Sequence, residues 1–311
     1  MVKPMPKRYD ANLVDNITKF HELEFHIMRG RNESAIYFDL DLDLSKTLPY
    51  IEKVNEGKGK KKITLFHIIL GAAVRTLALR PKLNRFVSNR RLWQRNTMTL
   101  AFVVKKMLDE DAGSVNAMID FDPFETLDTI SEKIDKHLYE ARKTNSNEND
   151  KQIEMITKMP RFLIRFIFWL VRWLDERNLF SKFVYSQTKD MPMYSSAFLA
   201  NLGSIGLPTV YHHLFEMGTI GFFLAIGKIT KRPFVDQETG ELSVRPMMTI
   251  RITLDDRISE GVYLRKAVDY LHLYIENPEE LEKPLELSQK QLDWLKLKKY
   301  KKDWSKKGKT K

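Results

Sequence analysis

The chain of 311 residues is 43% hydrophobic and 30% charged, a balance typical of a globular protein with a sizeable core. It contains no cysteine, which excludes disulfides, thiolate metal sites and a cysteine nucleophile. The formal net charge of +11 is concentrated in the lysines after residue 290, so the body of the chain is only mildly basic.

Strand and helix patterns alternate along the first half of the chain, after a polar, mixed segment over residues 1–33. Residues 36–42 alternate apolar and polar side chains, which predicts a strand. Ser45 is predicted to N-cap a short helix that runs through Val54. The strongest helical pattern covers residues 65–79, and Pro81 ends it. Further elements are expected as a buried strand over 98–104, a weaker strand over 112–119 and an amphipathic helix over 124–143.

Residues 144–192 are interpreted as an insertion that contains the most unusual helix of the chain. A solvated hinge over 144–150 precedes an apolar run over 159–174. At about 100° per residue, the three arginines that interrupt this run lie within roughly 40° of one another: Arg161, Arg165 and Arg172. The run is too short and too charged for a membrane span. It is either a core or oligomer-interface helix, or an interfacial helix on an anionic bilayer.

The second half of the chain again alternates strands and helices. Apolar strands are predicted over 195–201 and 220–229, and a hairpin turn over 236–240 leads into a strand over 244–254. A helix follows over 262–271, and residues 285–297 continue helically into the lysine tail. This alternation predicts an α/β protein, built as a two-layer sandwich around a mixed sheet.

The stretch 247–261 predicts a strand, a sharp turn and the start of a helix. Asp255 and Asp256 come where the strand ends, and Glu260 comes just before the helix. Acidic side chains between a strand end and a helix are a candidate site, because neighbouring carboxylates supply general acid–base groups.

Four stretches follow one another in a recognisable order. They are the helix with its Pro-Lys-Leu-Asn ending at 81–84, Asn-Leu-Gly-Ser at 201–204, Ala-Ile-Gly with a later proline at 225–233, and the stretch 247–261. Together they resemble the catalytic domain of the dihydrolipoyl acyltransferase component of 2-oxo acid dehydrogenase complexes, in the chloramphenicol acetyltransferase-like superfamily. With flanking elements, the resemblance covers residues 34–278. It implies a two-layer α/β sandwich, a homotrimer, and a channel between subunits where coenzyme A (CoA) meets the acyl acceptor.

The resemblance also implies a catalytic pair, and this chain departs from it. In the family a motif histidine takes the proton from a thiol, and a serine or threonine hydroxyl supports the oxyanion. Here the motif histidine aligns with Asp256, the motif aspartate with Glu260 and the serine with Ala200. A thiol has a pKa near 8.5 and an aspartate one near 3.9, so Asp256 is a base about four to five units too weak. Burial beside Glu260 raises the pKa of one carboxylate, but we do not expect it to close this gap.

Another candidate base is the pair His212 and His213. In the family, the segment after Asn-Leu-Gly runs close to the acceptor channel, and a histidine there has a pKa suited to a base. Asp256 or Glu260 would orient it. The alternative is that both histidines cap or pack. The resemblance places three further residues along the substrate site: Asn201, Ser204 and Arg257.

The remaining histidines have no ligand-like spacing, so we expect no metal site. We expect a stand-alone acyltransferase that moves an acyl group from acyl-CoA to an unidentified acceptor. The alternative is a catalytically inactive scaffold or binding protein on the same fold. Residues 1–285 are expected to form the catalytic domain, and residues 286–311 a basic C-terminal helix and tail.

No apolar signal core follows the N-terminus, so we expect a cytoplasmic protein. Residues 159–174 and the lysine tail over 296–311 are two weak anchors that together suit an anionic membrane surface, peripheral at the inner face. Nucleic acid is not expected as a partner, because the body lacks a basic stripe with exposed aromatic residues.

Overall fold

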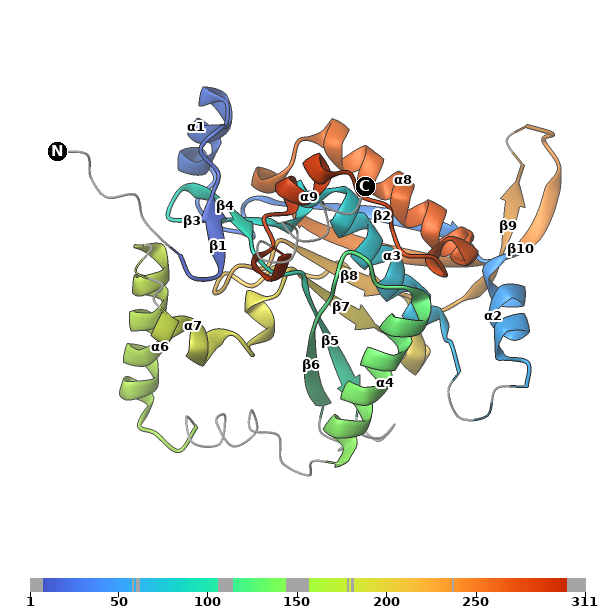
Figure 1. Ribbon diagram of the computed structural model, residues 1–311, viewed down its shortest axis with the longest axis horizontal. Coiled ribbons are helices and arrows are strands. Elements are labelled where there is room, and N and C mark those ends of the chain that lie inside the picture. Colours follow the sequence, from blue (N-terminus) through green and yellow to red (C-terminus); the bar gives the residue numbers. More distant parts are fainter. Residues whose placement is uncertain are drawn as a thin grey trace, which may run out of the picture.

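The computed structural model of the chain describes residues 8–57, 59, 62–105, 114–143, 157–177, 179, 182–236 and 238–300 (Figure 1). Within them, helices cover one face of a large mixed sheet, and a smaller three-stranded sheet adjoins it. The predicted hinge over 144–150 and the end of the lysine tail, 301–311, lie outside the described residues. The fold is the predicted α/β type, a two-layer sandwich with a mixed sheet.

The large sheet has seven strands, in the order β2-β10-β8-β7-β5-β6, with β9 paired to β10. The pairs β5–β7 and β7–β8 are parallel, and the other pairs are antiparallel. Parallel neighbours need long crossovers, and the part of the chain between β6 and β7 that the structure describes contains three helices. They are α4 (Leu127–Lys143), α6 (Arg161–Glu176) and α7 (Lys182–Thr188). The strands are β2 (Ala35–Asp43), β5 (Thr99–Lys105), β6 (Ser114–Asp120), β7 (Ala197–Asn201), β8 (Phe222–Ile226), β9 (Thr230–Val235) and β10 (Leu242–Asp255).

One face of this sheet, which we call the front face, is covered by α3 (Leu65–Leu79), α4 (Leu127–Lys143) and α8 (Gly261–Glu276) (Figure 1). Alternate residues of β10 point into this layer, and Ile250, Ile252 and Leu254 are all buried in the main core. The bounds of α3 are those predicted from the sequence. It is buried on nearly every side because it lies between the sheet and the other two helices.

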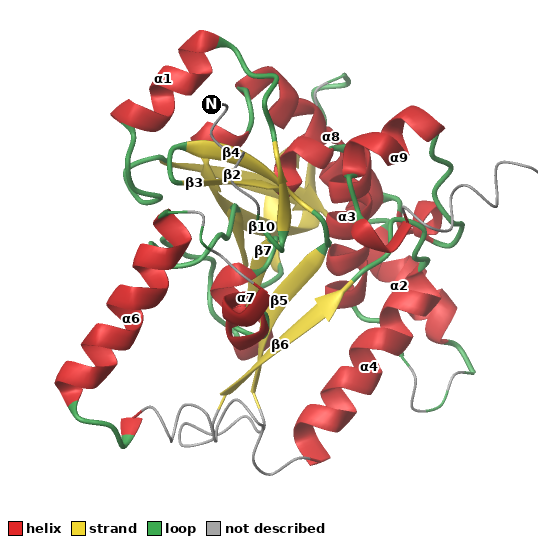
Figure 2. Ribbon diagram, turned by 60° about the vertical axis from the view of Figure 1, so that its left-hand side comes forward, coloured by secondary structure: helices red, strands yellow, loops and turns green. Residues whose placement is uncertain are grey.

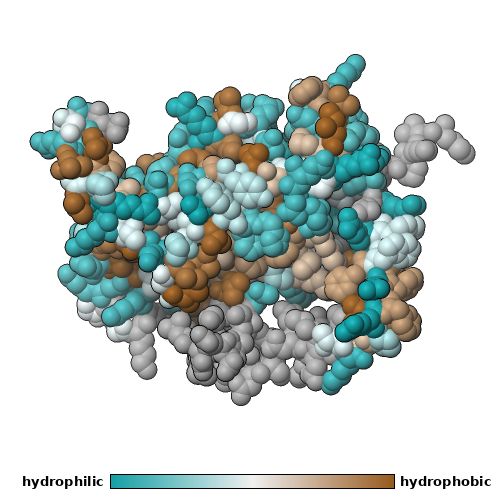
Figure 3. All heavy atoms as spheres, turned by 180° about the vertical axis from the view of Figure 1, so that it is seen from behind, coloured by the Kyte–Doolittle hydropathy of each residue, from teal (hydrophilic) through white to brown (hydrophobic). Residues whose placement is uncertain are grey.

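The opposite face, the rear face, is crossed by residues 207–217, which we call the strap. Thr209 Oγ1 donates to the Ala225 carbonyl at 2.7 Å, and Thr253 Oγ1 donates to the His212 carbonyl at 2.5 Å. A second small core lies on this face, around Phe198 and Phe223. Figure 3 views the molecule from behind and shows apolar side chains gathered on this face. Large apolar residues exposed on the strap and beside it are Tyr37, Ile205, Leu207, Val210 and Tyr211.

The sequence predicts no regular element in residues 1–33 or between 85 and 95, yet the structure has several there. Strands β1 (Ala11–Leu13), β3 (Arg85–Ser88) and β4 (Arg91–Arg95) form the smaller sheet, in the order β1-β4-β3. Helix α1 (Lys19–Ile27) follows β1, and the Thr18 side chain caps it by accepting from the His21 N–H. These strands are short and depend on each other for hydrogen bonds, so their local sequence carries little pattern.

The predicted N-cap at Ser45 is wrong. Helix α2 (Thr47–Asn55) begins two residues later than Ser45, after Lys46, which makes no side-chain cap. Ser45 instead donates to the Asp43 carboxylate from its N–H at 2.9 Å and its hydroxyl at 2.6 Å. Ser45 bonds to the Asp43 carboxylate and does not cap the helix, because hydrogen bonds to a charged carboxylate are stronger than those of a neutral cap.

Helices α6 (Arg161–Glu176) and α7 (Lys182–Thr188) lie at the edge of the molecule, with α7 between α6 and the strands (Figure 1 and Figure 2). Within the described residues, α6 exposes large aromatic side chains: Phe162 is 74% exposed, Trp169 56% and Phe166 53%. It is therefore not a core helix of this chain. Among the helices that the structure describes, none combines the length and apolar character needed to cross a bilayer. The last helix, α9 (Gln289–Leu295), leads to the C-terminal tail.

Candidate active site

The turn after β10 is held by a buried ion pair between Asp255 and Arg257, whose side chains are 1% and 3% exposed. Arg257 donates to the carboxylate from Nε at 2.8 Å and Nη2 at 2.7 Å, and its backbone N–H donates to the same group at 3.2 Å. This bidentate contact closes a short 3-10 turn over Asp256–Ile258 and fixes the direction in which α8 departs. Arg257 is thus buried and paired at this turn, and its assignment to the substrate site stays a prediction.

The turn is also braced by segments from the N-terminal part of the chain. The Asp256 N–H donates to the Ser34 carbonyl at 2.9 Å, and Arg257 Nη1 donates to the Met28 carbonyl at 2.9 Å. Nε2 of His21, on α1, lies 2.6 Å from the Arg257 carbonyl. Because a carbonyl only accepts hydrogen bonds, Nε2 carries the proton and Nδ1 keeps its lone pair. Three segments that are distant in sequence therefore converge on this turn.

Asp256 and Glu260, which the sequence resemblance aligns with the family's catalytic positions, are both exposed in this chain. No hydrogen bond or ion pair among the described residues joins either carboxylate to the other or to a histidine. Glu260 is the residue before α8 and makes no side-chain cap there. The burial expected to act on this pair is therefore absent within a single subunit.

His212 and His213 lie on the strap, across the rear face. The His212 ring stacks on Phe223 with centroids 3.8 Å apart, and its Nδ1 lies 2.8 Å from the His213 carbonyl. That hydrogen bond puts the proton on Nδ1 and leaves Nε2 as an acceptor, while burial lowers the pKa of His212. Glu260 begins a helix of the front face. No described contact within one subunit joins the histidines to Asp256 or Glu260, so that dyad stays a prediction.

Asn201 and Ser204 form the turn after β7. Asn201 Oδ1 accepts from the Ser204 N–H at 3.1 Å, and the Ser204 hydroxyl donates to the Asn201 carbonyl at 2.7 Å. Between them, a Cβ at Gly203 would lie 2.5 Å from the Gly227 carbonyl oxygen, so only glycine fits there. Both polar side chains are engaged in shaping the turn, and neither contacts the 256–260 turn.

A cavity of about 450 Å³ opens beside the 256–260 turn, and its polar lining includes His21, Ser259 and Glu260. Ile17, Pro81 and Ile258 contribute apolar walls, and the cationic side chains at its edge are Lys82, Arg85 and Lys296. A ligand-sized cavity with apolar walls and a few convergent polar groups is the usual form of a small-molecule site. In the described parts of the chain, no group of three or more His, Asp or Glu side chains gathers closely enough to hold a metal ion.

His21 is the site residue that the sequence did not identify. It has no motif partner nearby, and only the packing of α1 against the 256–260 turn brings it to the cavity. One local signal in the sequence is Thr18, three residues earlier, which is a good N-cap for a helix. That signal places His21 in the first turn of a helix but does not reveal what the helix packs against.

A sequence model of the family described as 2-oxoacid dehydrogenases acyltransferase (catalytic domain) matches residues 193–282. The matched part includes the Asn-Leu-Gly turn, the strap, β8 to β10 and the 256–260 turn. No curated protein sequence matches the chain.

Solved structures show the same fold at low sequence identity. A probable dihydrolipoamide acetyltransferase from Listeria monocytogenes aligns with a TM-score of 0.54 at 14% identity, over 85% of this chain and 94% of that chain. The cubic core of a pyruvate dehydrogenase multienzyme complex gives 0.56 at 13% identity, over 84% and 87%. A chloramphenicol acetyltransferase gives 0.50 at 12% identity, over 85% and 99%.

The resemblance identified from the sequence is therefore confirmed. The fold is chloramphenicol acetyltransferase-like, and residues 193–282 match the acyltransferase catalytic domain of 2-oxo acid dehydrogenase complexes. The replacement of the motif histidine by Asp256 stays a prediction.

Proposed function

We propose that the protein is a stand-alone acyltransferase that takes an acyl group from acyl-CoA and works at the cavity beside the 256–260 turn. The observation that carries this proposal is that a ligand-sized cavity lies against the 256–260 turn and that a histidine lines it. The sequence resemblance aligns this turn with the segment that carries the family's base. CoA is the expected co-substrate because the matched family transfers acyl groups to and from it.

In this proposal, His21 supplies the base that Asp256 cannot. Its Nε2–H is held by the Arg257 carbonyl, so Nδ1 can take the proton of an acceptor hydroxyl or thiol. The acceptor oxygen or sulfur attacks the thioester carbonyl, the carbon–sulfur bond breaks, and His21 returns the proton to the CoA thiolate. Glu260 lines the same cavity.

The test is thiol release from short- and long-chain acyl-CoAs, supplied with hydroxyl and thiol acceptors. His21→Gln keeps an amide that can donate to the Arg257 carbonyl but removes the base, so kcat/KM should fall by about 100-fold or more. His26→Gln, on the exposed side of the same helix, is the matched control and should retain full activity.

The same assay separates the other predicted bases. A loss confined to the His212→Ala/His213→Ala double variant would move the base to the strap. A loss confined to Asp256→Asn would return it to the family's own position. Undiminished turnover in His21→Gln would exclude His21.

A catalytically inactive scaffold or binding protein is the second candidate. What favours it is the predicted alignment, in which Asp256 and Ala200 stand where the family has a histidine and a serine. CoA binding by calorimetry without turnover of any donor would support this candidate, and turnover would exclude it.

We also propose that the protein is a homotrimer whose subunits meet at the rear face. Exposed apolar side chains on the strap, such as Leu207 and Tyr211, suit a subunit interface. Light scattering should give a trimer, and Leu207→Asp/Tyr211→Asp should give a folded monomer. Residues 1–285 would form the acyltransferase domain, and residues 286–311 a basic helix and tail.

Finally, we propose a cytoplasmic protein that is peripheral at the inner membrane face, through 159–174 and the lysine tail over 296–311. The exposed aromatic residues of α6 support this proposal, since Trp, Phe and Arg together suit a membrane interface. We expect no nucleic-acid partner.

A further inference from the structure

A second cavity, of about 90 Å³, shares no lining residue with the candidate active-site cavity and is lined by arginines. It opens between the end of α6, the β3–β4 turn, the end of α1 and residues 216–218. Five arginines contribute to its lining, together with two carboxylates, Asp175 and Glu216. The arginines are Arg29, Arg31, Arg90, Arg172 and Arg257. Arg90 is aimed there by a two-residue turn in which Asn89 and Arg90 both have positive φ.

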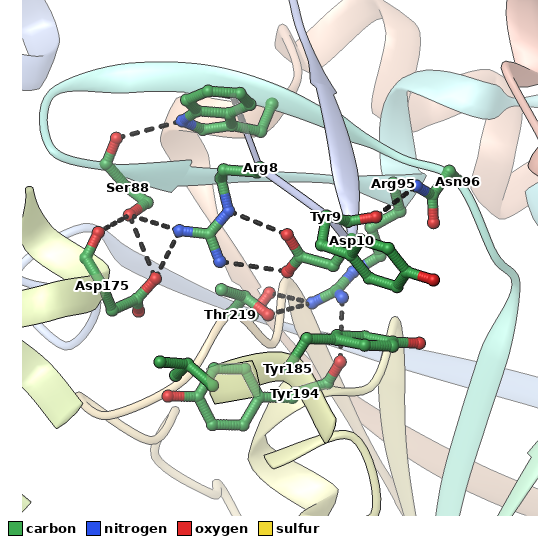
Figure 4. Close-up of polar contacts among 12 residues, drawn as sticks. Arg8, Tyr9, Asp10, Ser88, Arg95, Asn96, Asp175, Tyr185, Tyr194 and Thr219 are labelled. Atoms are coloured by element: carbon green, nitrogen blue, oxygen red, sulfur yellow. Dashed lines mark hydrogen bonds and ion pairs between the residues drawn. The ribbon is translucent and has the colours of Figure 1, made fainter. Parts of the chain in front are cut away.

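Both carboxylates at this cavity already have partners. Asp175 is held by Arg8 and Ser88, as Figure 4 shows, where Arg8 lies between Asp10 on one side and Ser88 and Asp175 on the other. Glu216 accepts hydrogen bonds from the N–H groups of Arg31 and Asn32 at 3.2 and 2.9 Å, and from the Asn32 side chain. Arg257 is paired with Asp255.

Arg31 is the buried floor of the cavity and lacks a full set of partners. It is 7% exposed, and its two terminal nitrogens donate to the carbonyls of Glu216 and Val87, at 2.6 and 3.2 Å. Its Nε is buried and has no hydrogen-bond partner within the described structure. Burial lowers the pKa of Arg31 by removing its guanidinium from water, although Asp255, Asp175 and Glu216 partly offset this effect. An anion in the cavity would supply the hydrogen-bond acceptor that Nε lacks and further stabilise the buried positive charge.

The size and the donors of the cavity suit one phosphate group. Its volume is far below the roughly 300 Å³ at which sites for whole organic ligands begin. Guanidinium groups recognise phosphate by paired, charge-assisted hydrogen bonds, and here several converge from different segments.

The neighbouring helix indicates where such a phosphate comes from. Arg172 of α6 lines the cavity, and along the same face of the helix follow the exposed Arg165 and Arg161. Beside this arginine row stand the exposed aromatic side chains of Phe166 and Trp169, whose rings stack at 5.8 Å. A helix with this exposed face suits the boundary between lipid head groups and acyl chains.

We propose that this arginine cavity binds the phosphate of an anionic lipid head group while the exposed aromatic residues of α6 enter the membrane interface. The proposal deepens the membrane association proposed above and rests on it, and it is independent of acyl transfer. A phosphomonoester is expected to bind best, since it carries the most charge and the most acceptor oxygens.

Binding to vesicles tests the proposal with the full chain and without acyl-CoA. Phosphatidylcholine vesicles are compared with vesicles that also contain phosphatidic acid or phosphatidylglycerol, at matched surface charge. Arg29→Gln/Arg90→Gln removes two exposed cavity arginines and should weaken binding to phosphatidic acid by about 30-fold. Lys19→Gln/Arg91→Gln removes the same charge from exposed positions outside the cavity and should change binding less than threefold. Phe166→Ser/Trp169→Ser should abolish binding while leaving the circular dichroism spectrum unchanged.

The other outcomes overturn the proposal. Equal losses in the cavity and control variants would mean diffuse electrostatic attraction. Inorganic phosphate that binds by calorimetry and is lost in Arg29→Gln/Arg90→Gln, with vesicle binding unaffected, would make the cavity a site for small anions. No binding to any vesicle would exclude a lipid site, whatever the thiol-release assay shows for acyl transfer.

Discussion

Replacing Asp255 by alanine should lower the free energy of unfolding far more than removing an exposed carboxylate does, because it leaves the buried guanidinium of Arg257 without its charged partner. The Asp255 and Arg257 side chains are 1% and 3% exposed and meet at 2.7 Å. Removing one partner of such a pair costs about 3–5 kcal/mol. Arg257 Nη1 would still donate to the carbonyls of Met28 and Arg29, so we expect the lower end, about 3 kcal/mol.

Urea unfolding, followed by circular dichroism and extrapolated to water, measures this cost. Asp41→Ala is the control, because Asp41 pairs with Arg232 on the surface, where their side chains are 58% and 40% exposed. Exposed ion pairs contribute less than about 1 kcal/mol. Asp255→Leu/Arg257→Met removes both buried charges and should recover part of the loss. If Asp255→Ala cost no more than Asp41→Ala, the buried pair would not be what holds the turn.

Three further predictions concern other elements. Gly203→Ala should lower the free energy of unfolding, measured in urea, by about 2–3 kcal/mol, because its Cβ would overlap the Gly227 carbonyl. Gly261→Ala is the control and should leave the stability unchanged, because the space around Gly261 is open. Equal losses of stability in the two variants would contradict the overlap. Burial lowers the pKa of His212, so the unfolded chain takes up this proton first, and stability should fall as pH drops below about 6.5. His212→Gln should flatten that fall between about pH 7 and pH 5, and an unchanged slope would refute the assignment. Asp175→Asn removes the charge that anchors α6 to Arg8, so limited proteolysis within α6 should become at least about tenfold faster. An unchanged rate of proteolysis would mean that other contacts hold α6 in place.

Sequence patterns identified the elements whose burial is regular. The apolar periodicity of residues 65–79 predicts α3 with the bounds it has, because a helix between a sheet and two other helices must be apolar on most sides. The alternation before Asp255 predicts β10, and its pairing with β2 keeps Ile250, Ile252 and Leu254 on the front face. The predicted cap at Ser45 was wrong because the Ser45 N–H and hydroxyl donate to Asp43, two residues away, and the helix begins only at Thr47.

The sequence by itself thus determined the layered fold, the position of the 256–260 turn and the amphipathic character of α6, since each depends on residues close together in the chain. Only the tertiary structure decided which side chains meet at a site. His21 reaches the Arg257 carbonyl across more than two hundred residues, and Arg31, Arg90 and Arg172 line one cavity from three separate elements. The reason is physical, because local periodicity reports only whether a residue faces the core, whereas a site requires polar groups that converge from segments brought together by packing.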